Sequence, residues 1–295
     1  MGAPILPRNA EDPQGSDRME RRAMADFDRR MRQVLRLYKD ALKATPYKAV
    51  TVNVTRYEFE LNPAILAVMT EEIDRAVDRI LLEGGASNLW FTTFYVEPSY
   101  AAGTAAAWRN LGSQAEVYRL SRPELAAVLQ SAPYRERLSY LAARQFENMA
   151  GLTAEVKASM GRILTDGLVQ GLNPRDVART LTEQAGIEAR RGHRIARTEV
   201  PNALRQARLD ETDQAVAEFG FHTKEMHFSA LSPTTRATHA ARHGNLYSVQ
   251  EQRIFWATSA NSINCRCSTI TVLTDQGGNP LNPALVSKVR AMKAG

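Results

Sequence analysis

Arg194-Ile-Ala-Arg-Thr-Glu-Val200 opens the stretch of sequence that decides the fold, and Asn264-Cys-Arg-Cys267 closes it, ahead of a β-branched run that ends at Leu273. Between them lies Thr235-Arg-Ala-Thr-His-Ala-Ala-Arg-His-Gly244. The histidines and cysteines of the chain all fall in this stretch or at its edges: His193, His222, His227, His239, His243, Cys265 and Cys267. Unusual side-chain chemistry is thus confined to one region, and we expect the rest of the chain to present, anchor or extend it.

The composition is that of a soluble globular protein, with 44% hydrophobic and 24% charged residues in a chain of 295, long enough for two domains. The net charge of +6 is a mild bias, which suits a solvated surface as well as contact with nucleic acid. No stretch approaches the roughly 20 apolar residues that span a bilayer, and the first residues lack the apolar core of a secretion signal. We therefore expect a protein made in a cytosol-like compartment, with no membrane segment.

The N-terminal part of the chain has a helical pattern. Residues 1–16 are predicted to form a flexible tail, and residues 17–172 a mainly helical region with a short β element. We expect an amphipathic helix from Asp17 to about Thr45, a strand over 50–61, a helix from Pro63 that Gly84-Gly85 stops, and separate helices over 133–149 and 153–169. The aromatic cluster within 89–97 suits a buried strand better than a docking surface.

The C-terminal part mixes helices and strands. Residues 173–275 are predicted to hold a short helix over 175–184, then a helix that Pro201 bends or begins. Strands over 224–228 and 264–273 follow, with a short helix near 233–243 between them. Residues 276–295 form a tail with a basic helix over 283–293. The predicted fold class is α+β, with a mostly helical N-terminal region and a compact α+β C-terminal module.

Two histidines and two cysteines have the spacing of a metal site. His239 and His243 are four residues apart, so on a helix they share one face, and Cys265 and Cys267 share one face of a strand. If the helix packs on the strand, these four residues form a tetrahedral zinc site. Packing or hydrogen bonding by the same side chains is the alternative. A metalloprotease motif is not present, because Ala240 stands where its glutamate would follow the first histidine.

Three charged residues are candidates for a structural clamp. Arg197 and Glu199 lie among small and apolar residues, where they are either catalytic or form a hydrogen-bonded tie between the helix and the sheet behind it. We favour the tie. Arg236 precedes His239 by one helical turn and is placed to pair with Glu199.

Two basic patches could contact phosphates. One is Arg190-Arg191-Gly-His-Arg194, and the other comprises Lys288, Arg290 and Lys293. Such residues also serve helix dipoles and solubility. Without interleaved aromatic residues, they would support non-specific rather than sequence-specific contact with DNA.

The ordered blocks, together with Phe255, resemble the Mu F-like minor head protein family of tailed bacteriophages, over roughly residues 173 to 273. The sequence departs from the family pattern at His243, where relatives have aspartate, and at Ser262-Ile263, where relatives often have proline. It also lacks a second cysteine pair that many relatives carry, for which only His239 and His243 could substitute.

The resemblance implies a structural and assembly component of the virion head, which requires no cofactor and is not an enzyme. Its partners would be the portal protein and the capsid, near the portal vertex, after assembly in the host cytoplasm. Aid to DNA packaging or ejection, with contact to packaged DNA, would follow. The alternatives are a metal-assisted hydrolase or nuclease that uses the histidines and cysteines with Glu199 as base, and a module that binds DNA by charge alone.

Overall fold

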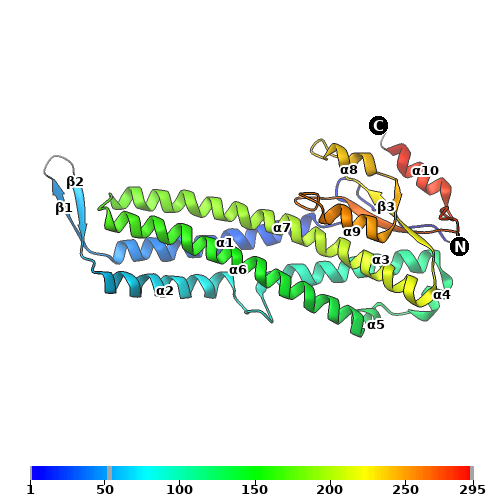
Figure 1. The fold of residues 1–295 in the computed structure, drawn as a ribbon, viewed down its shortest axis with the longest axis horizontal. Coiled ribbons are helices and arrows are strands. Elements are labelled where there is room, and N and C mark those ends of the chain that lie inside the picture. The colour runs from blue at the N-terminus through cyan, green and yellow to red at the C-terminus, as the bar shows by residue number, and fades with distance from the viewer. Residues whose placement is uncertain (1, 52–54, 293–295) are drawn as a thin grey trace. The chain divides into compact units, whose positions relative to one another are not determined.

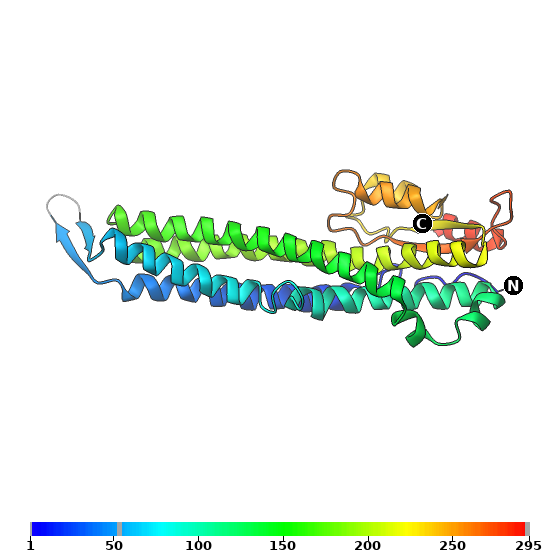
Figure 2. The same cartoon turned by 60° about the horizontal axis from the view of Figure 1, so that its bottom comes forward.

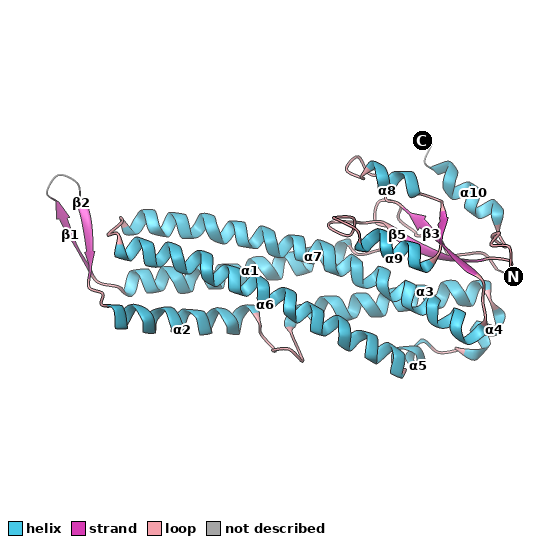
Figure 3. Cartoon of the chain, viewed as in Figure 1, coloured by secondary structure: helices cyan, strands magenta, loops and turns pink. Residues whose placement is uncertain are grey.

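The computed structural model describes residues 2–51 and 55–292 and is mainly helical with small antiparallel sheets (Figure 1). The predicted α+β class is confirmed, as Figure 3 shows by element type. The helices are α1 (Asp17–Ala44), α2 (Pro63–Leu81), the π-helix η1 (Thr92–Val96), α3 (Glu97–Gln114), α4 (Glu116–Ser121), α5 (Leu125–Leu129), α6 (Ala132–Val169), α7 (Pro174–Phe219), α8 (Ala237–Arg242), α9 (Val249–Ala257) and α10 (Pro283–Ala291). The strands are β1 (Tyr47–Thr51), β2 (Thr55–Phe59), β3 (Thr223–Phe228), β4 (Leu246–Tyr247) and β5 (Ser268–Leu273).

The chain divides into two compact units, each assembled from separate segments. One unit, here called the sheet unit, comprises Met1–Arg21, Phe94–Ser139 and Ala196–Gly295. The other, here called the bundle unit, comprises Arg22–Thr93 and Tyr140–Ile195. The domains expected from the sequence are continuous stretches of chain. The two units instead divide α1, α6 and α7, and each of these helices contributes residues to both units.

The bundle unit is built from α2 and from the parts of α1, α6 and α7 that it contains, which run side by side in Figure 1 and again in Figure 2. The amphipathic helix predicted from Asp17 is confirmed as α1. Phe27, Met31, Val34 and Tyr38 recur on one face of it and are buried, as their spacing of three and four residues requires.

The segment predicted as one strand over 50–61 is instead a hairpin. β1 and β2 pair antiparallel, with Tyr47 opposite Phe59 and Thr51 opposite Thr55; residues 52–54 lie outside the described residues. The prediction was wrong because alternating β-branched residues specify an extended backbone but not where the chain reverses. Both strands are largely exposed.

The aromatic cluster is core, as favoured, but it is helical rather than extended. Trp90 and Phe91 are buried and pack edge-on or tilted against Phe27. The guanidinium of Arg30 lies 4.0 Å from the Trp90 ring centroid, a cation–π contact. Beyond them, Phe94 in η1 is exposed.

Two helices are longer than the sequence suggested. Residues 133–149 and 153–169 belong to the single helix α6, which runs through Gly151. The segment 175–184 and the helix after Gly186 form the single helix α7, which also contains Pro201. An internal glycine costs a helix only about 1 kcal/mol, and the buried residues along these helices outweigh that cost.

The sheet of the sheet unit has the order β4-β3-β5, with antiparallel neighbours. The strand predicted over 224–228 is confirmed as β3, and the C-terminal helix as α10, although Lys293 lies outside the described residues. Met226, Ile270 and Val272 form a core with Val286 and Val289 of α10. The strand predicted over 264–273 begins only at Ser268, so the Asn-Cys-Arg-Cys element is the loop ahead of it.

Polar side chains tie α3 to β5. The amide of Gln114 donates to the Thr271 carbonyl at 2.9 Å and accepts from the Leu273 N–H at 3.0 Å. Asn110 donates to the same Thr271 carbonyl at 2.8 Å. Because each of these groups is buried, its hydrogen bond satisfies a polar atom that would otherwise be costly.

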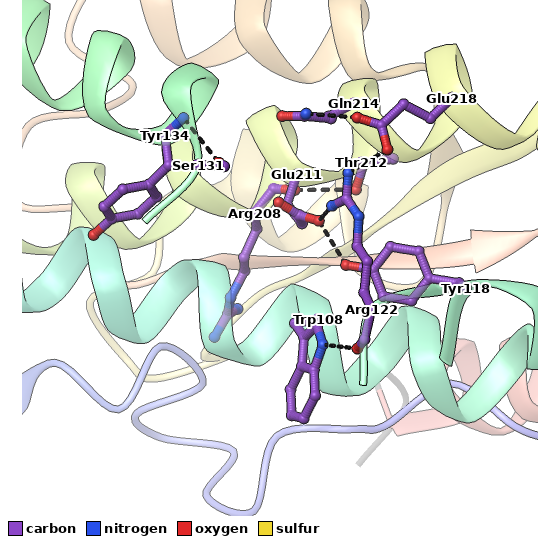
Figure 4. Close-up of polar contacts among 10 residues, drawn as sticks. All are labelled: Trp108, Tyr118, Arg122, Ser131, Tyr134, Arg208, Glu211, Thr212, Gln214 and Glu218. Carbon is purple, nitrogen blue, oxygen red and sulfur yellow. Dashed lines mark hydrogen bonds and ion pairs between the residues drawn. The ribbon is translucent and has the colours of Figure 1, made fainter. Parts of the chain in front are cut away.

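A charged network joins α4 and Arg122, which follows it, to α7 in the sheet unit (Figure 4). Tyr118 donates to Glu211 at 2.5 Å, and Arg122 donates to both Glu211 and Glu218. Trp108 on α3 donates to the Arg122 carbonyl at 2.9 Å.

Among the described residues, no helix is both long enough and apolar enough to cross a membrane.

Candidate metal centre and its supporting clamp

The candidate ligands come from separate elements of the sheet unit. His239 lies on α8, and Cys265 and Cys267 lie in the loop that leads into β5. All three side chains are buried. Nδ1 of His239 is 3.4 Å from Sγ of Cys265 and 3.5 Å from Sγ of Cys267. The structure therefore brings together three of the four residues that the sequence nominated.

His243 is engaged elsewhere. It is the C-cap residue of α8, which ends at Arg242, so the four-residue spacing from His239 does not place both rings on one helical face. Its Nδ1 accepts from the Ser229 N–H at 3.0 Å, and its Nε2 is 3.0 Å from the Val289 carbonyl. Both ring nitrogens thus serve the packing of α10 and the chain after β3.

His227 takes the place next to the cluster. It lies on β3, and one of its ring nitrogens, one from His239 and the Cys267 sulfur all lie within 4.8 Å of one another. Its Nδ1 is 3.2 Å from Oε1 of Gln252. Its Nε2 is buried and has no hydrogen-bond partner within the described part of the chain. Sequence reasoning missed His227 because it stands alone in a strand, without a spacing partner.

Arg242 fixes the tautomer of His227. It donates to the same Gln252 oxygen at 3.3 Å, which identifies that atom as the amide oxygen. Nδ1 of His227 must then carry the hydrogen, and Nε2 carries a lone pair. Gln252 itself is fully buried on α9, so this arrangement is held rigidly.

The electrostatics favour a neutral imidazole at His227 and a single thiol proton shared by Cys265 and Cys267. Burial lowers the pKa of His227 to about 3, so the ring is uncharged at neutral pH. A hydrogen bond with Cys267 lowers the pKa of Cys265, and the positive charge of Arg205 acts in the same direction. The same hydrogen bond, together with burial, raises the pKa of Cys267.

A buried clamp holds the cysteine loop, and its principal residues were missed from sequence. Arg205 on α7 is fully buried, and its Nη1 donates to the Cys265 carbonyl at 2.8 Å and more weakly to the Cys267 carbonyl. Gln14 donates to the Cys267 carbonyl at 2.7 Å. An arginine inside the apolar stripe of Val200, Ala203 and Leu204 was the available signal for this role.

Of the predicted clamp residues, Arg236 contacts the loop before the cysteine motif, whereas Arg197 and Glu199 lie on α7. Arg236 donates to the Asn261 carbonyl at 3.2 Å and to the Ile263 carbonyl, and its Nη1 is 3.2 Å from Nε2 of His239. Arg197 is exposed and Glu199 is half-buried, both on α7.

Asn264 is the first residue of the cysteine motif, and its backbone conformation favours asparagine at this position. Its φ of 51° lies in the left-handed region, which asparagine tolerates better than most residues. Its N–H donates to Oγ1 of Thr198 at 3.3 Å. The motif beginning at Arg194 and the cysteine motif are thus in direct contact.

A cavity of about 210 Å³ opens beside the cluster. Its walls include His239, Cys265 and Cys267, together with Ser232 and Arg236. Glu199, the base of the hydrolase alternative, is not among the described residues that line it. The cavity gives small ions a route to the sulfurs.

Residues 158–270 match the model of a family described as phage Mu protein F like protein. The match covers somewhat more than a third of the chain and runs from the second half of α6 into β5. No curated protein and no solved structure matches the chain significantly. The matched region is therefore similar to this family of phage proteins. The resemblance to the Mu F-like head proteins, drawn from the three motif blocks, is confirmed.

Proposed function

We propose that the chain is a minor component of the phage virion head that acts with the portal protein and the inner capsid, near the portal vertex. The observation that carries the proposal is the family match over residues 158–270. This region contains every candidate metal ligand. Gln14, which braces the cysteine loop from the N-terminal segment, lies outside it.

The bundle unit offers a surface for such a partner. Tyr47 and Val50 of β1 and Ile65 and Val68 of α2 are apolar and between about one third and just over one half exposed. Large apolar side chains that are exposed in one unit are typical of protein–protein contact sites. We infer that β1 and the first turns of α2 contact the portal or the capsid.

Co-purification tests this role. The full chain, produced with portal and capsid proteins, is expected to be retained by tagged portal or by procapsids. Ile65→Glu with Val68→Glu should abolish retention, whereas Leu120→Glu, at an even more exposed apolar position in the sheet unit, should not. Failure of the unaltered chain to associate with either structure would contradict the proposal.

The candidate site supports a structural rather than a catalytic role. Its cysteines and histidines are buried and mutually in contact, and buried arginine and glutamine clamp the loop that carries them. The rival, a metal-assisted hydrolase or nuclease, predicts hydrolysis that chelators abolish. An assay on DNA and on model esters, with and without chelator, separates the two.

We also propose that the chain contacts packaged DNA, and the net charge of +6 supports this contact. Arg190, Arg194 and Lys288 are exposed cations that could contact phosphates. Binding by charge alone predicts affinity that falls steeply as salt rises and that does not depend on sequence. Fluorescence anisotropy with unrelated duplexes at two salt concentrations measures both properties.

A further inference from the structure

We infer that His227, His239, Cys265 and Cys267 bind a structural zinc ion, and that His227 rather than His243 is the fourth ligand. This inference concerns the sheet unit alone and stands whatever partner the chain has in the head.

The two separations between His239 and the cysteine sulfurs suit a tetrahedral site, and His227 lies within 4.8 Å of His239 and Cys267. Zinc bonds of about 2.3 Å to sulfur and 2.0–2.1 Å to nitrogen, at a tetrahedral angle, place a ligand sulfur and nitrogen roughly 3.5 Å apart. Nδ1 of His239 is 3.4 and 3.5 Å from the two cysteine sulfurs. Two thiolates and two imidazoles in this geometry are a donor set that suits zinc.

Nε2 of His227, which has no hydrogen-bond partner in the described chain, distinguishes a metal site from a cluster held by hydrogen bonds alone. Thiol–imidazole hydrogen bonds would account for the His239 distances equally well. They leave Nε2 of His227 buried without a partner in the described chain, although Arg242 and Gln252 orient its lone pair. A buried lone pair without a donor is costly, and a metal ion removes that cost.

Contacts outside the cluster orient the ring of His227 and the loop that carries the cysteines. Gln252 accepts from Nδ1–H of His227, which fixes the ring for coordination through Nε2. Coordination of His239 through Nδ1 places the hydrogen on its Nε2, so Nη1 of Arg236, 3.2 Å away, cannot donate to that nitrogen when the metal is bound. Arg236 then keeps its hydrogen bonds to the Asn261 and Ile263 carbonyls. Arg205 and Gln14 hold the carbonyls of the cysteine loop.

A matched pair of substitutions tests the ligand set. The full chain is purified under reducing conditions, equilibrated with zinc, freed of excess metal and measured by elemental analysis. We expect about one zinc per chain in the unaltered protein and in His243→Gln, whose amide can replace both hydrogen bonds of the imidazole. His227→Gln should lose the zinc. Retention by His227→Gln with loss in His243→Gln would overturn the ligand set, and a folded, metal-free unaltered protein would overturn the site.

Cobalt replacement tests the site in the unaltered chain first and then in one variant. The unaltered chain loaded with cobalt should show the intense visible absorption of a tetrahedral ion and a thiolate charge-transfer band. Cys267→Ser should reduce that band by about half, because one of two thiolates is removed. Weak absorption typical of a six-coordinate ion would overturn the proposal.

Gln252 is a positioning residue whose role is measured by metal affinity. We expect Gln252→Ala to bind zinc 10–100-fold more weakly in competition with a chromophoric chelator, the usual effect of removing a group that orients a ligand. A variant that folds and binds zinc with unchanged affinity would overturn the assignment of Nε2 as the ligand atom.

Discussion

The carboxyl group of Glu225 is fully buried in the middle of the sheet. It lies on β3 opposite Thr271, and the hydroxyl of Thr269 donates to it. Burial raises its pKa from 4.5 to about 7. Arg208, whose own pKa burial lowers to about 10, is the nearby positive charge. Such a group makes the stability of the sheet unit depend on pH.

The sign of that dependence follows from the direction of the shift. Between pH 4.5 and 7 the folded chain holds the Glu225 proton more tightly than the unfolded chain, so the free energy of unfolding falls as pH rises through this window. The loss approaches about 3 kcal/mol as an upper bound. Glu225→Gln should flatten the decline measured by urea unfolding between pH 5 and 8, whereas Glu124→Gln, at an exposed carboxylate, should leave it. A Glu225→Gln curve parallel to the unaltered one would contradict this.

Arg122 and Arg119 allow a buried ion pair to be compared with an exposed one. Arg122 pairs with Glu211, whose side chain is only 3% exposed, while Arg119 and Glu116 are more than half exposed. Arg122→Ala leaves the buried carboxylate of Glu211 without its ion pair but with the hydrogen bond from Tyr118, and should cost on the order of 3 kcal/mol. Arg119→Ala should cost less than about 1 kcal/mol. Equal losses in denaturant unfolding would show that the network of Figure 4 is not a stabilising contact.

At the scale of elements, α3 and α7 approach each other at a glycine. A Cβ atom added at Gly103 would lie 2.4 Å from the Leu204 carbonyl oxygen and 2.8 Å from Cβ of Ala207. At Gly112, on the same helix, the nearest atom would be Cβ of Arg119 at 3.9 Å. The two positions therefore separate close packing from helix propensity.

Gly103→Ala should destabilise the sheet unit by about 1–3 kcal/mol, because the backbones must move apart. Gly112→Ala should stabilise it by up to about 1 kcal/mol, since alanine favours a helix and meets no obstacle. Thermal unfolding of both variants beside the unaltered chain measures the difference. A stabilised Gly103→Ala would mean that the two helices are not in contact there.

The elements that the sequence predicts well are those with a regular apolar period. Phe27, Val34 and Tyr38 define the buried face of α1, and Met226 and Phe228 mark β3. Period alone does not fix where a chain turns or stops. It therefore misses the reversal between β1 and β2, and it breaks α6 at Gly151, where the helix continues.

The candidate site shows the same limit at closer range. The cysteine motif identifies its half of the cluster, because two thiols in one loop are close by necessity. The histidine half depends on where α8 ends and on which strand residue faces the loop. His243 lies beyond the helix end, and His227 is brought in by strand pairing. Neither fact has a spacing signature.

At the scale of the whole molecule, the N-terminal segment belongs to the sheet unit although the sequence predicts a flexible tail for residues 1–16. The Ile5 N–H donates to Oδ1 of Asn110 at 2.8 Å, and Gln14 reaches the carbonyls of Pro201 and Cys267. The segment forms one wall of a cavity of about 710 Å³, with Arg109 of α3 and Thr271 of β5 on the other walls. Few apolar anchors are needed, because buried hydrogen bonds hold the segment.

Removal of the residues before Asp17 should loosen the sheet unit and spare the bundle unit. The carbonyl of Cys267 loses its Gln14 donor, and the face of β5 next to the cavity opens to water, so amides over 268–273 should exchange hydrogen faster. Amides of α2, which lies wholly in the bundle unit, should exchange at unchanged rates. Gln14→Ala should reproduce part of the effect near the cysteine loop only, because it removes one bond and keeps the cavity wall. Hydrogen exchange with mass spectrometry resolves these segments. Unchanged exchange over 268–273 in the truncated chain would show that the first residues do not brace the strand, and faster exchange in α2 as well would show a general loss of stability instead.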